Sequence, residues 1–182
     1  MNKILSREFF QRPTLIICED LIGKYLVRRF NTTDHTAGRE FLLDLSFIIT
    51  EVEAYDGFDD KASHAACGKT QRNEIMFESG GYIYIYLIYG MYWMLNIVTY
   101  KKNYPSAILV RGTKEISGPG RLTKHLNLDK SFNKKILSKQ TGLWIEDRNF
   151  YPAKKLIFRT SRIGVNYAGP IWAKKPYRFI LK

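Results

Sequence analysis

Hydrophobic and polar residues alternate along several stretches of the chain, and this pattern predicts more strands than helices. The stretch FLLDLSFIITEVEAY (41–55) is rich in β-branched and aromatic residues and indicates a long strand. SAILVRG (106–112) indicates a further strand. Three shorter stretches late in the chain fit the same pattern: LWIED (143–147), KLIFRT (155–160) and YRFIL (177–181).

The stretch GYIYIYLIYGMYWMLNIVTY (81–100) predicts a protruding β-hairpin. Tyr82, Tyr84 and Tyr86 alternate with aliphatic residues, which is the two-residue period of a strand. Tyr89 and Gly90 supply the turn, because glycine adopts a positive φ without steric cost.

Helical patterns are few. ICEDLIGKYLVRRF (17–30) indicates a short helix that runs into a strand, and GPGRLTKHL (118–126) a helix that opens after a Gly-Pro-Gly turn. DGFDDKASHAACGKTQRN (56–73) reads as a loop with one helical turn. No linker divides the chain, so we expect one domain over 1–182. The expected fold class is α+β, with a mainly antiparallel curved sheet and a few helices.

Charge is distributed unevenly along the 182 residues, which carry a net +12. Residues 1–100 hold 10 basic and 13 acidic residues, a balance of −3, whereas residues 101–182 hold 19 and 4, a balance of +15. Such asymmetry favours a basic face for a polyanion such as nucleic acid. The alternative is that the basic residues only keep the protein soluble.

The compartment is expected to be the cytoplasm, with nucleoid association in a bacterium. No apolar run is long enough to span a bilayer, and the N-terminal MNKILSREFFQRP is charged where a secretory signal needs an apolar core. Cys18 and Cys67 form neither a C-x-x-C motif nor part of a zinc ligand set. A single disulfide between them stays an open alternative.

The tyrosines of the predicted hairpin have two interpretations. Aromatic residues on a strand usually belong to the core. Several of them on one strand face could instead form a stacking platform for a nucleic-acid base, and an aromatic side chain at the tip could wedge between base pairs.

The stretch TEVEAYDGFDD (50–60) concentrates acidic residues in a basic protein. Acids near the binding site of a polyanion weaken binding, so one of them is a candidate for a chemical role; the alternative is a solvated acidic loop. Glu51, Glu53 and Tyr55 share strand parity and are expected to face the same way. His64 follows nearby, and a lone histidine is weak evidence for a functional site. No H-x-E…C-x-x-C pattern for zinc deamination is present.

Nine blocks in order resemble the alkyladenine (3-methyladenine) DNA glycosylase family, of the hairpin-bearing, monofunctional kind. These are REFFQRP (7–13), LIGKYLVRR (21–29), TEVEAYDGFDDKASHA (50–65), KTQRNEIMF (69–77), YIYIYLIYGMYWMLN (82–96), ILVRG (108–112), SGPGRL (117–122), LDKSFN (128–133) and RIGVNYAGPIWAKKPYRF (162–179).

The resemblance implies a base-excision repair enzyme that acts on double-stranded DNA containing damaged purines. It would flip an alkylated or deaminated purine out of the duplex and hydrolyse its N-glycosidic bond, leaving an abasic site. Family members need no metal or organic cofactor. A monomer is the simplest expectation for a single-domain enzyme of this kind.

The resemblance also implies roles for individual residues. Glu53 matches the general base that activates water, Arg111 the arginine that holds this water and a phosphate, and Ile163 a residue whose backbone carbonyl touches the water. A carboxylate suits this reaction, because it can both deprotonate water and stabilise an oxocarbenium-like state. No lysine or proline stands in the matched site as an amine nucleophile, so lyase activity is not expected.

Tyr55, His64 and Tyr86 match the pocket that sandwiches the flipped base, and Asn96 matches the asparagine that clashes with the 2-amino group of guanine. Tyr89 matches the residue that fills the gap left in the base stack. Further matches suggest contacts with the DNA backbone, made by Thr70, Arg72, Met91, Tyr92, Gly120, Arg121 and Lys130.

Two features depart from the family's pattern. Only GTKEI (112–116) separates Arg111 from Ser117, where family members have a longer stretch, and Trp93 and SHAACG (63–68) differ from the residues expected beside the pocket.

Two other functional classes stay open on the residues alone. One is a non-catalytic nucleic-acid-binding domain on the same fold, and the other a structural or ribosome-associated basic protein.

Overall fold

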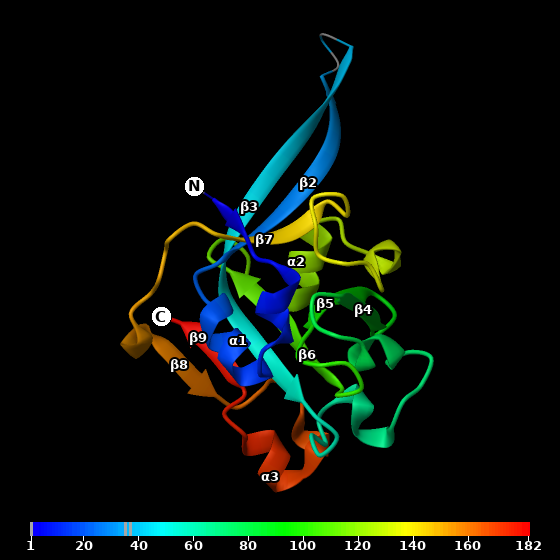
Figure 1. The fold of residues 1–182 in the computed structure, drawn as a ribbon, viewed down its shortest axis with the longest axis vertical. Coiled ribbons are helices and arrows are strands. Elements are labelled where there is room, and N and C mark those ends of the chain that lie inside the picture. The colour runs from blue at the N-terminus through cyan, green and yellow to red at the C-terminus, as the bar shows by residue number, and fades with distance from the viewer. Residues whose placement is uncertain (1, 35, 37) are drawn as a thin grey trace.

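The computed structural model describes residues 2–34, 36 and 38–182 of the chain (Figure 1). Its strands are β1 (Lys3–Ile4), β2 (Tyr25–Asp34), β3 (Arg39–Asp56), β4 (Ile83–Ile88), β5 (Tyr92–Val98), β6 (Ser106–Thr113), β7 (Leu143–Asp147), β8 (Ile157–Thr160) and β9 (Arg178–Leu181). Its α-helices are α1 (Thr14–Leu21), α2 (Pro119–His125) and α3 (Gly169–Lys174), and 3₁₀ turns connect several of these elements.

One antiparallel sheet organises the described residues. Its strands follow the order β1-β7-β2-β3-β6-β5-β4, and β9 pairs with both β3 and β8. The long strand β3 joins the two halves, because it pairs with β2 along its first half and with β6 and β9 along its second. This sheet with its few helices confirms the predicted α+β class.

Two of the three α-helices in the described residues, α1 and α2, lie close to their predicted places, and α3 was not predicted. The first begins at Thr14, three residues before the predicted stretch, and the second confirms the helix expected after the Gly-Pro-Gly turn. None of the helices in the described part of the chain is long and apolar enough to cross a membrane. Cys18 is buried in α1 and Cys67 is exposed, and both are free thiols, which excludes the disulfide left open above.

Of the three late strands, β7 has the predicted bounds, Leu143–Asp147, and the other two are shorter than predicted. Residues 154–156 form a 3₁₀ turn, so β8 begins only at Ile157, and β9 begins at Arg178. The predicted strand over 41–55 is longer in the structure, from Arg39 to Asp56.

The two faces of the sheet have different chemistry around β3 and β6. Val52 and Val110 point into the main hydrophobic core, which also contains residues of α1 and α2. Glu53 and Tyr55 alternate with the core residues of β3 and therefore point to the other face. The sheet thus has a core face and a site face, and the candidate site lies on the latter.

The hairpin β4–β5 has the predicted turn. Tyr89 and Gly90 have φ values of 53° and 70°, and the backbone N–H of Met91 donates to the carbonyl of Ile88 at 3.1 Å. A positive φ is unusual for tyrosine, so the turn holds an aromatic side chain in a conformation that glycine or asparagine would adopt more easily.

A second hairpin, formed by β2 and the start of β3, projects far beyond the rest of the molecule (Figure 1). Its strands pair residue by residue from Tyr25 opposite Ile48 to Asp34 opposite Arg39. The sequence predicted a long strand here, and did not predict that the first part of that strand would leave the body of the protein.

Candidate active site

A cavity opens on the site face of the sheet, and the space between its walls, open solvent at its mouth included, is about 310 Å³. It is lined by Tyr55, Ala62, His64, Met76, Tyr84, Tyr86, Asn96, Ala107 and Tyr167. Four neighbouring strands, β3 to β6, contribute to it, as do the loops after β3 and before α3. A wider groove adjoins it and shares Tyr55, His64, Tyr86 and Tyr167 with it.

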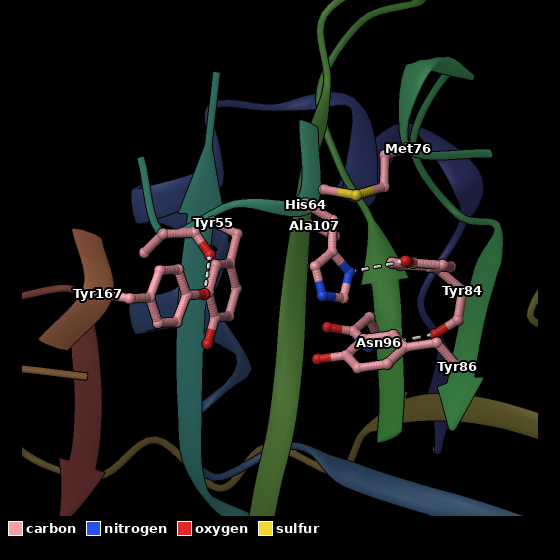
Figure 2. A pocket seen from close by; sticks show the side chains of 9 residues that line it. Tyr55, His64, Met76, Tyr84, Tyr86, Asn96, Ala107 and Tyr167 are labelled. Carbon is pink, nitrogen blue, oxygen red and sulfur yellow. Dashed lines mark hydrogen bonds between the residues drawn. The ribbon is translucent and has the colours of Figure 1, made fainter. Parts of the chain in front are cut away.

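Aromatic rings form two opposing walls of this cavity (Figure 2). Tyr55 and Tyr167 lie on one side, and His64, Tyr84 and Tyr86 lie on the other. The imidazole of His64 meets the ring of Tyr86 edge-on, with centroids 4.5 Å apart. Walls of this kind can hold a flat aromatic ligand between them.

His64 is fixed at the cavity by contacts of its ring and its backbone. Nδ1 lies 2.9 Å from the hydroxyl of Tyr84, and Nδ2 of Asn73 donates to its backbone carbonyl at 2.8 Å. The protein atoms around the imidazole, and then the charge of Arg72, lower the pKa of His64 to about 4. At neutral pH the ring is therefore uncharged, and Nε2 stays available to a ligand.

Asn96 lies in the cavity on β5. Its side-chain Nδ2 donates to the backbone carbonyls of Met94 at 3.1 Å and Tyr84 at 3.3 Å. These bonds use both amide hydrogens and fix the orientation of the side chain.

Glu53 is fully buried, with no exposed surface. Its Oε1 accepts a hydrogen bond from the backbone N–H of Ile163 at 2.8 Å, and its Oε2 accepts from the Tyr55 hydroxyl at 3.0 Å and Nη1 of Arg111 at 3.3 Å. Burial raises the pKa of Glu53 above that of an ordinary glutamate, while Arg111 and the two other donors lower it again in part. The result is a poorly solvated carboxylate, which is a stronger base than a solvated one.

A second carboxylate orients the arginine beside Glu53. Oε1 of Glu51 accepts from Nε of Arg111 at 2.9 Å and from Nε of Arg178 at 2.7 Å. The predicted shared orientation of Glu51, Glu53 and Tyr55 is confirmed by these contacts. Two carboxylates and two guanidinium groups balance in charge here.

A buried ion pair that the sequence did not predict supports the wall of the cavity. The guanidinium of Arg162 donates to both oxygens of Asp60, at 2.6 and 2.8 Å, and to the carbonyl of Ala54 at 2.8 Å. It also lies 4.8 Å from the centroid of the Tyr55 ring. Arg162 thereby joins the strand that carries Tyr55 to the loop that carries Ile163.

The hairpin tip exposes its aromatic residues. Tyr89 is 82% exposed, and Met91 and Tyr92 are also exposed. The ring of Tyr92 packs on Gly120 at the start of α2, where an added Cβ would lie 2.8 Å from it. The hairpin and the Gly-Pro-Gly turn therefore form one surface.

The other residues predicted to contact DNA also reach the surface. Arg121 and Lys130 are exposed on and after α2, and Thr70 is exposed in the loop after β3. Arg72 lies 5.4 Å from the Tyr86 ring centroid and lines the groove, so it is near the cavity as well.

The structure brings the predicted residues together from distant parts of the sequence. Tyr55, His64, Tyr86 and Asn96 line one cavity, and Arg111 and Ile163 both contact Glu53. Ile163 makes this contact through its N–H, whereas the sequence analysis assigned a role to its carbonyl.

Other residues differ from their expected roles. Tyr84, to which we gave no chemistry, lines the cavity and bonds to His64; its strand parity with Tyr86 was the available signal. Tyr167 and Arg162 come from a loop with no periodic pattern to identify them. Trp93 was expected beside the pocket, but it packs against the main core because it alternates with Met94.

Comparisons with known proteins show the family to which the chain belongs. The model of the Methylpurine-DNA glycosylase (MPG) family matches residues 8–117 and 112–182. A protein of Methanocella arvoryzae named "Putative 3-methyladenine DNA glycosylase" is 40% identical over 97% of this chain and 91% of its own length. Proteins with the same name from Legionella pneumophila (strain Corby) and Sodalis glossinidius are 38% and 40% identical, over 98% and 90% of this chain and 94% and 91% of their own lengths. The chain belongs to the methylpurine-DNA glycosylase family.

Proposed function

We propose that this protein is a monofunctional DNA glycosylase that flips an alkylated or deaminated purine out of duplex DNA and hydrolyses its N-glycosidic bond. One observation carries the proposal. A fully buried carboxylate, Glu53, lies beside an aromatic cavity and is held by three donors in a chain of this family.

The cavity supplies the binding step. A flipped purine enters between the wall of Tyr55 and the wall of Tyr86 and His64, where stacking on each ring contributes about 1–3 kcal/mol. A cationic base such as 3-methyladenine gains further from the electron-rich faces of these rings. Neutral His64 offers a ring nitrogen to the edge of the base, and Asn96 limits the bases that fit.

Glu53 supplies the chemical step. It takes a proton from a water molecule that attacks C1′ of the sugar, while the bond from C1′ to the purine nitrogen breaks and the base leaves. The negative charge of Glu53 also stabilises the oxocarbenium-like state as positive charge develops on the sugar. Arg111, held by Glu51, keeps the carboxylate in place and offers charge to a nearby phosphate.

The exposed hairpin supplies the flipping step. Tyr89 occupies the gap in the base stack, in the manner of other side chains that wedge into DNA. Around it, Met91, Tyr92, Thr70 and Arg72 contact the backbone, and Gly120, Arg121 and Lys130 extend the interface.

The lining residues favour hydrolysis without strand cleavage. Among the described residues that line the cavity and the adjoining groove there is no lysine, and Pro119 carries no free amine. A glycosylase with lyase activity needs an amine nucleophile that forms a Schiff base. Water is therefore the proposed nucleophile.

Base release and strand integrity test this function together. Duplexes carrying methylated purines or a hypoxanthine:thymine pair are incubated with the protein, and free base and strand breaks are measured before and after alkali. We expect release of free base, with breaks only after alkali. Tight binding without release from either duplex would favour a non-catalytic DNA-binding domain, and breaks before alkali would contradict the monofunctional mechanism.

A further inference from the structure

Arg178 on β9 lies directly opposite Glu53 on β3, so both side chains point to the site face of the sheet. The guanidinium of Arg178 reaches along β3 to Glu51, where Nε donates to Oε1 at 2.7 Å. The side chains of this ion pair are 23% and 14% exposed, so solvent screens their charges only in part. A partly buried cation this close to the candidate base can influence the charge state of that base.

Glu51 lies between two guanidinium groups. Its Oε1 also accepts from Nε of Arg111 at 2.9 Å, and Nη1 of the same guanidinium donates to Oε2 of Glu53 at 3.3 Å. Four side chains therefore form a row of alternating charges, in the order Arg178, Glu51, Arg111 and Glu53. A shift of Glu51 would move Arg111 relative to Glu53.

The backbone of β6 is irregular at the point where it carries Arg111. Two consecutive residues of β3, Glu51 and Val52, lie opposite Gly112 and Val110, which leaves Arg111 as an extra residue in β6. A bulge of this kind re-aims a side chain, and the regular strand pairing no longer fixes its direction. The contacts of the guanidinium with the two carboxylates therefore determine where it lies.

Arg178 also balances the charge of this row. Glu51 and Glu53 compete for Arg111, because a nearby positive charge stabilises each carboxylate. Burial raises the pKa of Glu53, and Arg111 and, to a smaller extent, Arg178 lower it again. Without Arg178, the two carboxylates would share a single guanidinium, and Arg111 would stabilise the charge of Glu53 less.

We propose that Arg178 is a positioning residue for base release, which holds Glu51 against Arg111 and keeps Glu53 in its carboxylate form. The inference rests on the proposed function, because the reaction needs this carboxylate only if Glu53 activates water. Arg178 acts through Glu51 and Arg111, and so it needs no contact with the base or the sugar. Direct contact with a DNA phosphate is the alternative role for this arginine, and it predicts different results.

The surroundings of Glu53 allow its titration to be followed separately. The charged or titratable groups near it are Glu51 and Tyr55 on β3, Tyr86 on β4, Arg111 on β6, Arg178 on β9, Asp60, Arg162 and Tyr167 in the flanking loops, and Cys18 in α1 on the core side. Burial raises the pKa of each of these tyrosines and of the cysteine, and the guanidinium groups keep their charge. The groups of this set that titrate in acid are therefore carboxylates.

Titration of Glu53 in the free protein, followed by NMR, tests this role without any substrate. Glutamate is isotope-labelled at the carboxyl carbon, and Glu53→Gln and Glu51→Gln assign the two signals. Arg178→Gln should raise the pKa of Glu53, because a positive charge is lost nearby. Glu51→Gln should lower the pKa of Glu53, because the competing negative charge is lost. Arg178→Lys keeps the charge and should leave the pKa of Glu53 close to its wild-type value.

Single-turnover base release from methylated duplex DNA is then compared among the same variants. For Arg178→Gln we expect an acid limb at higher pH and, above it, a rate lower by about tenfold or more, because Arg111 and Glu53 are less well aligned. Arg178→Lys should restore most of this rate. Arg159→Gln is the matched control, because Arg159 on β8 lies opposite the core residue Phe179 and points to the core face. It removes the same charge and should leave both measurements unchanged.

Two results would overturn the inference. The first is a Glu53 pKa that keeps its wild-type value in Arg178→Gln. The second is a weaker affinity for duplex DNA with an unshifted acid limb, which would indicate that Arg178 contacts a phosphate. Thermal unfolding confirms that the variants fold, and Arg178→Met is a second neutral variant should Arg178→Gln not fold. The titration needs no DNA, so its failure is distinguishable from failure of the proposed function, which an absence of base release by wild type would show.

Discussion

At the scale of single residues, the site depends on a carboxylate that the fold removes from water. A buried charge is costly unless hydrogen bonds and an opposite charge compensate for it. The hydroxyl of Tyr55, the N–H of Ile163 and the guanidinium of Arg111 give Glu53 this compensation. The compensation is partial, because the pKa of Glu53 stays raised.

This raised pKa predicts the acid limb of the pH profile. A general base works in its deprotonated form, so the single-turnover rate of base release should fall as pH drops through the raised pKa of Glu53. Tyr55→Phe removes a hydrogen bond that lowers this pKa and keeps the ring that stacks on the base. The acid limb of this variant should therefore move to higher pH. An acid limb at or below the pKa of an ordinary glutamate in wild type would contradict the account.

The sequence predicts which strand residues point to the same face of the sheet, because side chains two positions apart on a strand lie on one face. Glu53 and Tyr55, and likewise Tyr84 and Tyr86, follow from that rule. Arg162, Asp60 and Tyr167 lie on connecting segments without periodicity. Their meeting at the site depends on tertiary packing, which the order of residues alone does not reveal.

Asp60 tests the importance of this packing. Asp60→Asn leaves the guanidinium of Arg162 buried without its charged partner, which should lower the free energy of unfolding by about 3–5 kcal/mol. Chemical denaturation monitored by tryptophan fluorescence measures this loss. Asp59→Asn, one position away and exposed, is the matched control and should have little effect. Equal stability of both variants would show that the ion pair does not hold the loop.

At the scale of elements, the hairpin β4–β5 combines a wall of the cavity with an exposed tip. Alternation along 81–100 and the Tyr-Gly turn predicted this element correctly, because both are local signals. The projecting hairpin of β2 and the first part of β3 was not predicted, because the same apolar pattern describes a buried strand and an exposed one. The position of α2, whose His125 packs on Phe47, determines where β3 stops being covered by the core.

The tip residue can be tested without disturbing the turn. Tyr89→Asn removes the ring, and asparagine accepts the positive φ of 53° at this position. Base release from a damaged duplex should fall about tenfold or more, since loss of the wedge costs a few kcal/mol of unstacking. Release from the same lesion in single-stranded DNA should be unchanged, because no stack has to be opened. An equal loss on both substrates would contradict the wedge role.

At the scale of the whole molecule, the basic balance of residues 101–182 predicts binding dominated by phosphate contacts. The dissociation constant for undamaged duplex DNA should rise steeply with salt, by about one logarithmic unit per unit of log salt for each phosphate contacted. Arg121→Ala should reduce this slope by about 1. Arg39→Ala, at the start of β3 in the projecting β2–β3 hairpin, removes the same charge and should leave the slope unchanged. Equal slopes for wild type and Arg121→Ala would exclude Arg121 from the interface.

The most direct test of the account is the single-turnover rate of base release by Glu53→Gln on methylated duplex DNA. The variant keeps the shape of the side chain and removes its basicity. We predict a rate lower by about 10²–10⁴ or more, with affinity for the damaged duplex retained. Release at the wild-type rate would contradict the assignment of Glu53 as the base that activates water.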